Sequence, residues 1–237
     1  MLADGMMVAR GDLGVEMQPE DVPPIQRKIV TACRRVGKPV VVATQMLESM
    51  ITNPVPTRAE SADVARAVYD GADAVMLSAE SAAGQYPREA VAMMDRIIRE
   101  TEQSSHYHQS AAVGDREATG SDAISAAARQ VAETVDAKAI VTHTRSGRTA
   151  QRASRERPQV PIIMITPEVD TARQYTIVWG LHCVVSPDMP SLDAVFDEGG
   201  RIAVDEGFAQ KGDQVVLTAG VPFGQVGQTN LLRLLTV

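Results

Sequence analysis

The sequence predicts an α/β protein whose strands form parallel sheets in two domains. Short apolar runs such as VVVA at Val40–Ala43 alternate with segments whose apolar residues recur at helical spacing. The stretch from Ser104 to Thr119 interrupts this alternation with small polar residues, and a second alternating set follows it. A length of 237 residues leaves room for one or two domains with sizeable cores.

The first alternating set contains three expected strands with helices between them. A helical stripe spans Pro23 to Val36 and ends at Gly37. Thr57 and Glu60 have the spacing of a capping box at the start of the next helix, and Pro87 suits the first turn of another. The expected strands are Met6–Ala9, Val40–Ala43 and Ala74–Leu77. This order predicts βαβ units with right-handed crossovers.

The second set repeats this plan without a residue-level repeat. Ser121 is the expected cap of its first helix, and Gly199-Gly200 weakens the middle of its last one. The other expected helices are 147–155, a short one within 171–180, and 191–206. The expected strands are 139–142, 162–165, 181–185, 215–218 and 231–236.

Charge and composition exclude several classes of protein. Lys plus Arg number 23 and Asp plus Glu number 30, so the net charge is −7 and a broad nucleic-acid-binding surface is not expected. No apolar run approaches the ~20 residues needed to span a bilayer, and no basic n-region of a signal peptide is present. Cys33 and Cys183 form neither a disulfide framework nor a metal cluster. We therefore expect a cytoplasmic protein with no membrane partner.

In parallel sheets, ligands bind at the carboxyl ends of the strands, so the residues that follow each strand are candidates. Gly11 allows a close backbone approach to a ligand, and Asp12 is an oxygen ligand suited to Mg²⁺; a Gly-rich turn with a capping Asp is the alternative. Thr44 can hydrogen-bond a substrate or relay a proton, or simply cap a helix. For Glu80 a structural role is favoured. The Arg-Gly-Asp tripeptide at Arg10 is read as a coincidence.

A second candidate site follows the strand at 139–142. Hydroxyl groups, two arginines and a glycine at a helix N-terminus favour a phosphate-binding loop over a solvated loop. The Gly-rich segment 220–227 can fold over such a site. Neither a Walker A sequence nor a G-x-G-x-x-G fingerprint is present. His106 and His108 are expected to be surface residues, and Trp179 a core residue.

The residues of these two sites resemble the pyruvate kinase family. The resemblance is carried by MMVARGDLGVEM, by VVVATQMLESMITNPVPTRAESADVARAVYDGADAVMLSAESAAGQYPREAV and by THTRSGRTA. It covers essentially the whole chain and is strongest over Asp4–Val91. It implies an incomplete (β/α)₈ barrel of the TIM type, represented by its last three β/α units, followed by a smaller α/β regulatory domain. The implied bounds are 1–104 for the barrel part, 105–118 for a connection and 119–237 for the regulatory domain.

The family is a transferase of glycolysis that moves a phosphoryl group from phosphoenolpyruvate to ADP, giving pyruvate and ATP, with Mg²⁺ and K⁺. By resemblance, Gly11 and Asp12 would bind the substrate carboxylate through their amides, and Asp12 would also be a metal ligand. Thr44 would be the catalytic residue on the face where the enolate is protonated. Arg58 would lie at a subunit interface of a homo-oligomer, a tetramer in the family.

The resemblance also implies an allosteric effector site. Its phosphate-binding residues would be Thr144, Arg145, Ser146, Gly147, Arg148 and Thr149, with 220–227 as their cover. The expected effector is a sugar phosphate or AMP. Ala79, Ser81 and Ala83 replace the commoner Gly, Thr and Lys of the family, changes that we expect to leave the chemistry unaltered.

The family's catalytic lysine, second metal carboxylate, K⁺ ligands, ADP-contacting residues and lid domain have no counterpart in this sequence. We therefore expect a fragment that is not active alone, because phosphoryl transfer depends on positioning and charge neutralisation. A non-catalytic phosphate-effector-binding module is the alternative, in which 144–149 would work without the barrel.

Overall fold

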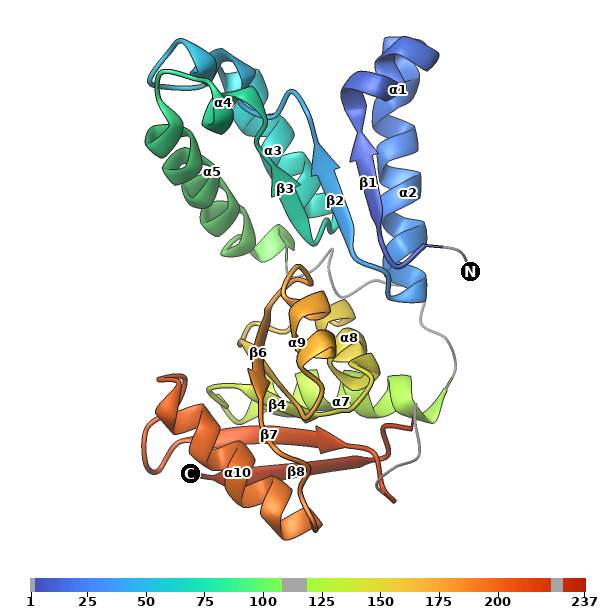
Figure 1. Cartoon of the computed structure of the whole chain (residues 1–237), viewed down its shortest axis with the longest axis vertical. Helices are drawn as coiled ribbons and strands as arrows, with labels where there is room; N and C mark the ends of the chain where they lie inside the picture. Colours follow the sequence, from blue (N-terminus) through green and yellow to red (C-terminus); the bar gives the residue numbers. More distant parts are fainter. Residues whose placement is uncertain (1–2, 108–118, 223–227) are drawn as a thin grey trace. The chain divides into compact units, whose positions relative to one another are not determined.

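A computed structural model describes residues 3–107, 119–222 and 228–237 (Figure 1). The chain divides into two compact units, Met1–Gly114 and Asp115–Val237. The predicted connection 105–118 lies mostly outside the described residues, so the domain bounds given above remain a prediction. Within the described ranges, no helix is long and apolar enough to cross a membrane.

The first unit is a three-stranded parallel sheet with helices between its strands (Figure 1). The strand order is β1-β2-β3, with Met6 opposite Val40 and Val42 opposite Val75. The strands are β1 (Met6–Ala9), β2 (Val40–Ala43) and β3 (Ala74–Met76). The helices are α1 (Arg10–Glu16), α2 (Val22–Val36), α3 (Arg58–Asp70), α4 (Ala79–Ala82) and α5 (Pro87–Glu102), with short 3₁₀ turns η1 at Pro19–Asp21 and η2 at Glu48–Ile51. Successive β/α units of this kind agree with the predicted partial barrel.

Local sequence signals explain the ends of these helices. Gly37 adopts a left-handed conformation (φ 71°) that ends α2. At the start of α3, the Glu60 amide donates to Thr57 Oγ1 over 3.2 Å, and the Thr57 amide donates to the Glu60 carboxylate over 2.7 Å, as the capping box predicts. Helices α2, α3 and α5 bury their apolar stripes with the sheet in one core that includes Val30 and Val42.

The second unit is a five-stranded sheet in the order β6-β5-β4-β7-β8. Neighbouring strands are parallel except β8, which is antiparallel to β7. The strands are β4 (Ile140–His143), β5 (Ile162–Thr166), β6 (Leu181–Val185), β7 (Gln214–Ala219) and β8 (Leu231–Thr236). The helices are α7 (Gly120–Thr134), α8 (Arg148–Arg155), α9 (Val169–Tyr175) and α10 (Leu192–Asp205).

One local expectation for this unit was wrong. Thr119, not Ser121, caps α7: its side chain accepts from the Asp122 amide over 3.2 Å, whereas Ser121 Oγ accepts from the Thr229 amide over 2.9 Å. The helix predicted over 191–206 is α10, which runs continuously through Gly199-Gly200. A Cβ at Gly199 would lie 2.8 Å from Leu217 Cδ1, so a glycine there lets the helix approach the sheet closely.

Candidate functional site

The ends of β1 and β2 bring two of the predicted substrate-site residues together. The Gly11 amide, in the first turn of α1, donates to Thr44 Oγ1 over 2.8 Å. Thr44 Oγ1 in turn donates to the Ala43 carbonyl over 2.6 Å. The in-register parallel pairing of Ala9 with Ala43 explains why the residues after these strands meet. In this state the Thr44 hydroxyl has a partner on both its donor and its acceptor side.

The turn that carries Thr44 has an unusual backbone. Thr44 (φ 68°) and Gln45 (φ 53°) are consecutive non-glycine residues in the left-handed region. Such a conformation costs roughly 1–2 kcal/mol per residue. Both residues directly follow buried β2, so the strain lies at the end of the strand where the predicted ligand would sit.

Arg10 lies at this turn, although the sequence pattern indicates no role for it beyond the Arg-Gly-Asp tripeptide. Its side chain is buried and forms an ion pair with Asp63 of α3. Its Nη2 donates to the carbonyls of Thr44 (2.6 Å) and Gln45 (2.9 Å), and its Nε donates to Thr44 O over 3.2 Å. No sequence spacing points to Asp63, which lies 53 residues away.

Asp12 lies in the first turn of α1 with an exposed side chain, where the helix dipole favours a negative charge. It does not cap this helix, since the N-cap position is Ala9. Among the described residues, no group of three or more His, Cys, Asp or Glu side chains is placed to hold a metal ion. One exposed carboxylate does not satisfy the near-octahedral coordination of Mg²⁺, so these residues alone do not form a complete Mg²⁺ site.

Glu80 has the structural role favoured by the sequence. Its buried carboxylate accepts the amides of Leu47 (3.2 Å) and Ser78 (2.7 Å), and thereby ties the segment after β2 to the segment after β3. Arg58, the predicted interface residue, begins α3 and is exposed. Its subunit contact stays a prediction.

In the second unit, half of the predicted phosphate-binding residues stabilise the loop itself. Thr144 is buried at the end of β4, and Thr149 Oγ1 lies 2.9 Å from Thr229 Oγ1. The Arg145 guanidinium forms ion pairs with Glu168 and Asp188. The Thr149 and Arg145 side chains thus already have protein partners, and burial removes Thr144 from direct contact with a ligand.

Ser146, Gly147 and Arg148 complete this loop, with Ser146 half-buried and Gly147 buried. Gly147 is the N-cap of α8 with φ 76°, and Arg148 begins the helix with an exposed side chain. The Tyr175 hydroxyl donates to the Ser146 carbonyl over 3.3 Å. Burial raises the pKa of Tyr175, and the nearby Arg148 charge partly opposes this shift. An anion placed here would meet a helix N-terminus and one guanidinium.

A buried carboxylate connects the loop helix α8 to α7. Asp122 accepts a hydrogen bond from the Thr119 hydroxyl over 2.6 Å, pairs with Arg155, and has Arg152 Nε at 3.5 Å. Burial raises the pKa of Asp122, but the hydrogen bonds from Thr119 and Arg155 and the charges of both arginines outweigh it, so the pKa is lowered. At the other end of the loop, burial lowers the pKa of His143.

The remaining candidates from the sequence are the predicted cover 220–227, the two histidines of the connection and Trp179. In the predicted cover, residues 223–227 lie outside the described residues, and Val221 at its base exchanges two hydrogen bonds with Asn230 (2.8 and 2.6 Å). His108 also lies outside the described residues, while the His106 ring contacts Tyr69 edge-on at 5.4 Å. Trp179 is partly buried beneath the Arg157 guanidinium, 4.7 Å from its ring centroid.

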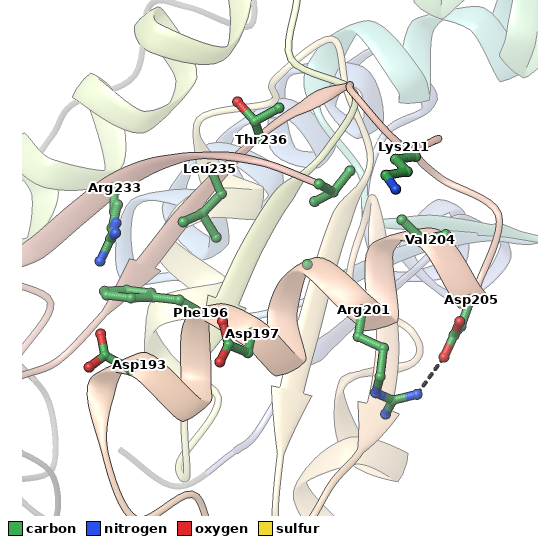
Figure 2. A pocket seen from close by; sticks show the side chains of 12 residues that line it. Asp193, Phe196, Asp197, Arg201, Val204, Asp205, Lys211, Arg233, Leu235 and Thr236 are labelled. Atoms are coloured by element: carbon green, nitrogen blue, oxygen red, sulfur yellow. Dashed lines mark hydrogen bonds and ion pairs between the residues drawn. The ribbon is translucent and has the colours of Figure 1, made fainter.

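A separate pocket of about 470 Å³ lies between α10 and β8 (Figure 2). Its floor is apolar and includes Phe196, whose ring lies 4.2 Å from the Arg233 guanidinium carbon. Arg201 at its rim pairs with Glu198 and Asp205. None of the predicted site residues lines this pocket.

Comparisons with known proteins match the chain to two family models and to several named relatives. Residues 1–91 match the family model "Pyruvate kinase, barrel domain", and residues 122–235 match "Pyruvate kinase, alpha/beta domain". Proteins named pyruvate kinase are 52% identical in Methylorubrum extorquens and 50% identical in Agrobacterium vitis, over 98% of this chain and 49% of theirs. The Geobacillus stearothermophilus pyruvate kinase is 47% identical over 98% of this chain and 40% of its own length. The chain thus spans about half the length, or less, of these relatives.

Proposed function

Because the chain belongs to the pyruvate kinase family, we propose that it carries part of the site that transfers a phosphoryl group from phosphoenolpyruvate to ADP. In this proposal, the amides of Gly11 and Asp12 bind the substrate carboxylate, and the Thr44 hydroxyl lies at the face where the enolate is protonated. Residues 1–104 are the barrel part and 119–237 the regulatory domain. The protein acts in the cytoplasm as a homo-oligomer with Arg58 at a subunit contact.

The contact between Gly11 and Thr44 carries this proposal. An amide at the start of a helix and a hydroxyl at the end of the adjacent parallel strand lie 2.8 Å apart, at the edge of the sheet where ligands bind. An added Cβ at Gly11 would lie 3.6 Å from Thr44 Oγ1, an ordinary van der Waals contact, so the fold should tolerate an alanine there. The extra methyl group would nevertheless narrow the approach of a small carboxylate to the Gly11 amide.

A binding experiment tests this assignment. We expect phosphoenolpyruvate, added to the ¹⁵N-labelled chain, to shift the amide signals of Gly11 and Asp12, and Gly11→Ala to abolish the shift. Gly14→Ala is the matched control, since nothing lies within 4 Å of a Cβ at that position of the same helix. Unchanged Gly11 and Asp12 signals at millimolar phosphoenolpyruvate would contradict the proposal.

Turnover is a separate question, because the described residues do not form a complete Mg²⁺ site. Asp12 is proposed as one ligand, and the other Mg²⁺ ligands and those of K⁺ would come from outside these residues. We expect no pyruvate from the isolated chain with phosphoenolpyruvate, ADP, Mg²⁺ and K⁺. Robust turnover would show that the described residues need no further Mg²⁺ or K⁺ ligands for the reaction.

The exposed Arg148 at the start of α8 favours a second function, binding of a phosphate effector. Sugar phosphates or AMP should raise the melting temperature of the second unit, and Arg148→Ala should remove that rise. Arg173→Ala is the control, because Arg173 is an exposed arginine of α9 outside the loop. If effectors bind but phosphoenolpyruvate does not, the chain is a phosphate-sensing module rather than part of a catalytic site.

A further inference from the structure

The Arg10 guanidinium bridges two helices and a strained turn. It begins at the first residue of α1, pairs with Asp63 on α3, and donates to the carbonyls of both left-handed residues that follow β2. The same guanidinium contacts Met46 Sδ, 2.9 Å from Nη2. Every described partner of this side chain is therefore either the turn, the residue after it, or the carboxylate that fixes the guanidinium.

We propose that Arg10, anchored by Asp63, is a positioning residue that holds Thr44 and Gln45 in their left-handed conformation and so keeps Thr44 Oγ1 against the Gly11 amide. We call this set of contacts from Arg10 to Asp63, Thr44 and Gln45 the clamp. Its consequence for catalysis rests on the proposed function, but the clamp itself does not. Left-handed backbone is disfavoured for residues with a Cβ, and more so for a β-branched one such as Thr44. Hydrogen bonds from a buried cation to the two carbonyls are charge-assisted, and they stabilise that conformation.

The chemistry of arginine suits this role. A planar guanidinium presents donors in several fixed directions, so one group can reach two adjacent carbonyls and a carboxylate together. A lysine ammonium is a single point with a shorter reach, and it cannot keep all three contacts. Asp63 balances the buried charge and sets the orientation of the fork, since an unpaired buried cation would be costly.

Nuclear magnetic resonance tests the clamp without any turnover. In Arg10→Lys, we expect Thr44 and Gln45 to lose the ¹³C shifts typical of left-handed residues, and the Gly11 amide to exchange with solvent about tenfold faster, because a left-handed non-glycine residue is disfavoured by roughly that factor. Arg66→Lys, which alters an exposed arginine paired with Asp70 on α3, is the matched control and should leave these signals unchanged.

A second substitution separates positioning from general stability. Gln45 is exposed, and glycine is free to adopt its φ, so Gln45→Gly should recover most of the lost Gly11 protection in the Arg10→Lys background. A purely structural loss would not be rescued in this way. If Arg10→Lys fails to fold, Asp63→Asn provides the same test, with an intermediate loss and the same rescue.

The proposal is overturned if Thr44 and Gln45 keep their left-handed signals without the arginine, or if Gln45→Gly rescues neither variant. Binding of phosphoenolpyruvate has no part in these measurements. The clamp can therefore fail while the proposed substrate site holds, and the substrate site can fail while the clamp holds.

Discussion

Gly147→Ala should destabilise the candidate effector loop through two separate effects, on the backbone and on packing. Gly147 has φ 76°, and a Cβ built on it would lie 2.3 Å from Tyr175 Cζ. The left-handed conformation alone costs an alanine about 1–2 kcal/mol. Overpacking against a half-buried ring adds about 1–3 kcal/mol, so the second unit should lose roughly 2–5 kcal/mol of unfolding free energy.

Gly207→Ala separates these two terms. Gly207 lies in the same unit with φ 78°, but nothing is within 4 Å of its added Cβ. Its alanine variant should therefore lose only about 1–2 kcal/mol. Urea unfolding followed by the fluorescence of Trp179, the one tryptophan in the sequence, measures both variants in the unit that contains them.

The ring of Tyr175 is the stated cause, and removing it is the decisive test. In a Tyr175→Ala background, Gly147→Ala should cost no more stability than Gly207→Ala does. The cost of Gly147→Ala in the natural background minus its cost in the Tyr175→Ala background is the coupling energy between positions 147 and 175. Equal losses of stability in the two glycine variants, in the natural background, would contradict the role given to the Tyr175 ring. Loss of effector-induced stabilisation in Gly147→Ala should accompany the displacement of Tyr175, because its hydroxyl holds the Ser146 carbonyl.

Gly199→Ala should destabilise the second unit by roughly 1–2 kcal/mol in urea unfolding, because the clash with Leu217 outweighs the better helix propensity of alanine. Gly200→Ala is the control and should change the stability by less than about 1 kcal/mol. Equal effects of the two substitutions would contradict close packing at Gly199. The lowered pKa of Asp122 means that its stabilisation is present above its ordinary pKa and is lost as pH falls through the lower folded value. Asp122→Asn should therefore flatten the acid limb of stability against pH, and an unchanged limb would refute this. Glu80→Gln should lower the unfolding free energy of the first unit by about 1–3 kcal/mol, because the new NH₂ group would face a backbone N–H donor. Denaturant unfolding followed by circular dichroism measures this loss, and an unchanged stability would contradict the structural role of Glu80.

The sheet core was predictable because burial on both faces leaves a simple signal. The bounds of β1, β2, β6 and β8 agree with the expected strands, each a short run of mainly apolar residues. The sequence carries no signal for the direction of β8, because an edge strand can pair either parallel or antiparallel with its neighbour. Helices α1 and α4 were missed because they are one or two turns long and have no apolar stripe.

Individual site residues were predictable only near the carboxyl end of a strand. Gly11 and Thr44 lie within two residues of such an end, and the structure brings them into contact. Arg10 directly follows β1 as well, but its pairing with Asp63 could not be predicted, because the two residues are 53 positions apart and belong to no recognisable spacing. In the 144–149 loop, residue type alone did not show that Arg145 forms ion pairs with Glu168 and Asp188 or that Arg148 is the arginine at the start of α8.

The occupied hydrogen bond between Gly11 and Thr44 has a consequence under the proposed function. A carboxylate that takes the Gly11 amide must displace the Thr44 hydroxyl, which accepts from that amide over 2.8 Å. This exchange is favourable, since a charged acceptor forms a stronger hydrogen bond than a neutral hydroxyl does. Afterwards Thr44 Oγ1 keeps its contact with the Ala43 carbonyl but has lost its donor. Substrate binding would thus free one lone pair of the Thr44 hydroxyl oxygen beside the bound molecule, while the hydroxyl proton stays in its hydrogen bond to the Ala43 carbonyl.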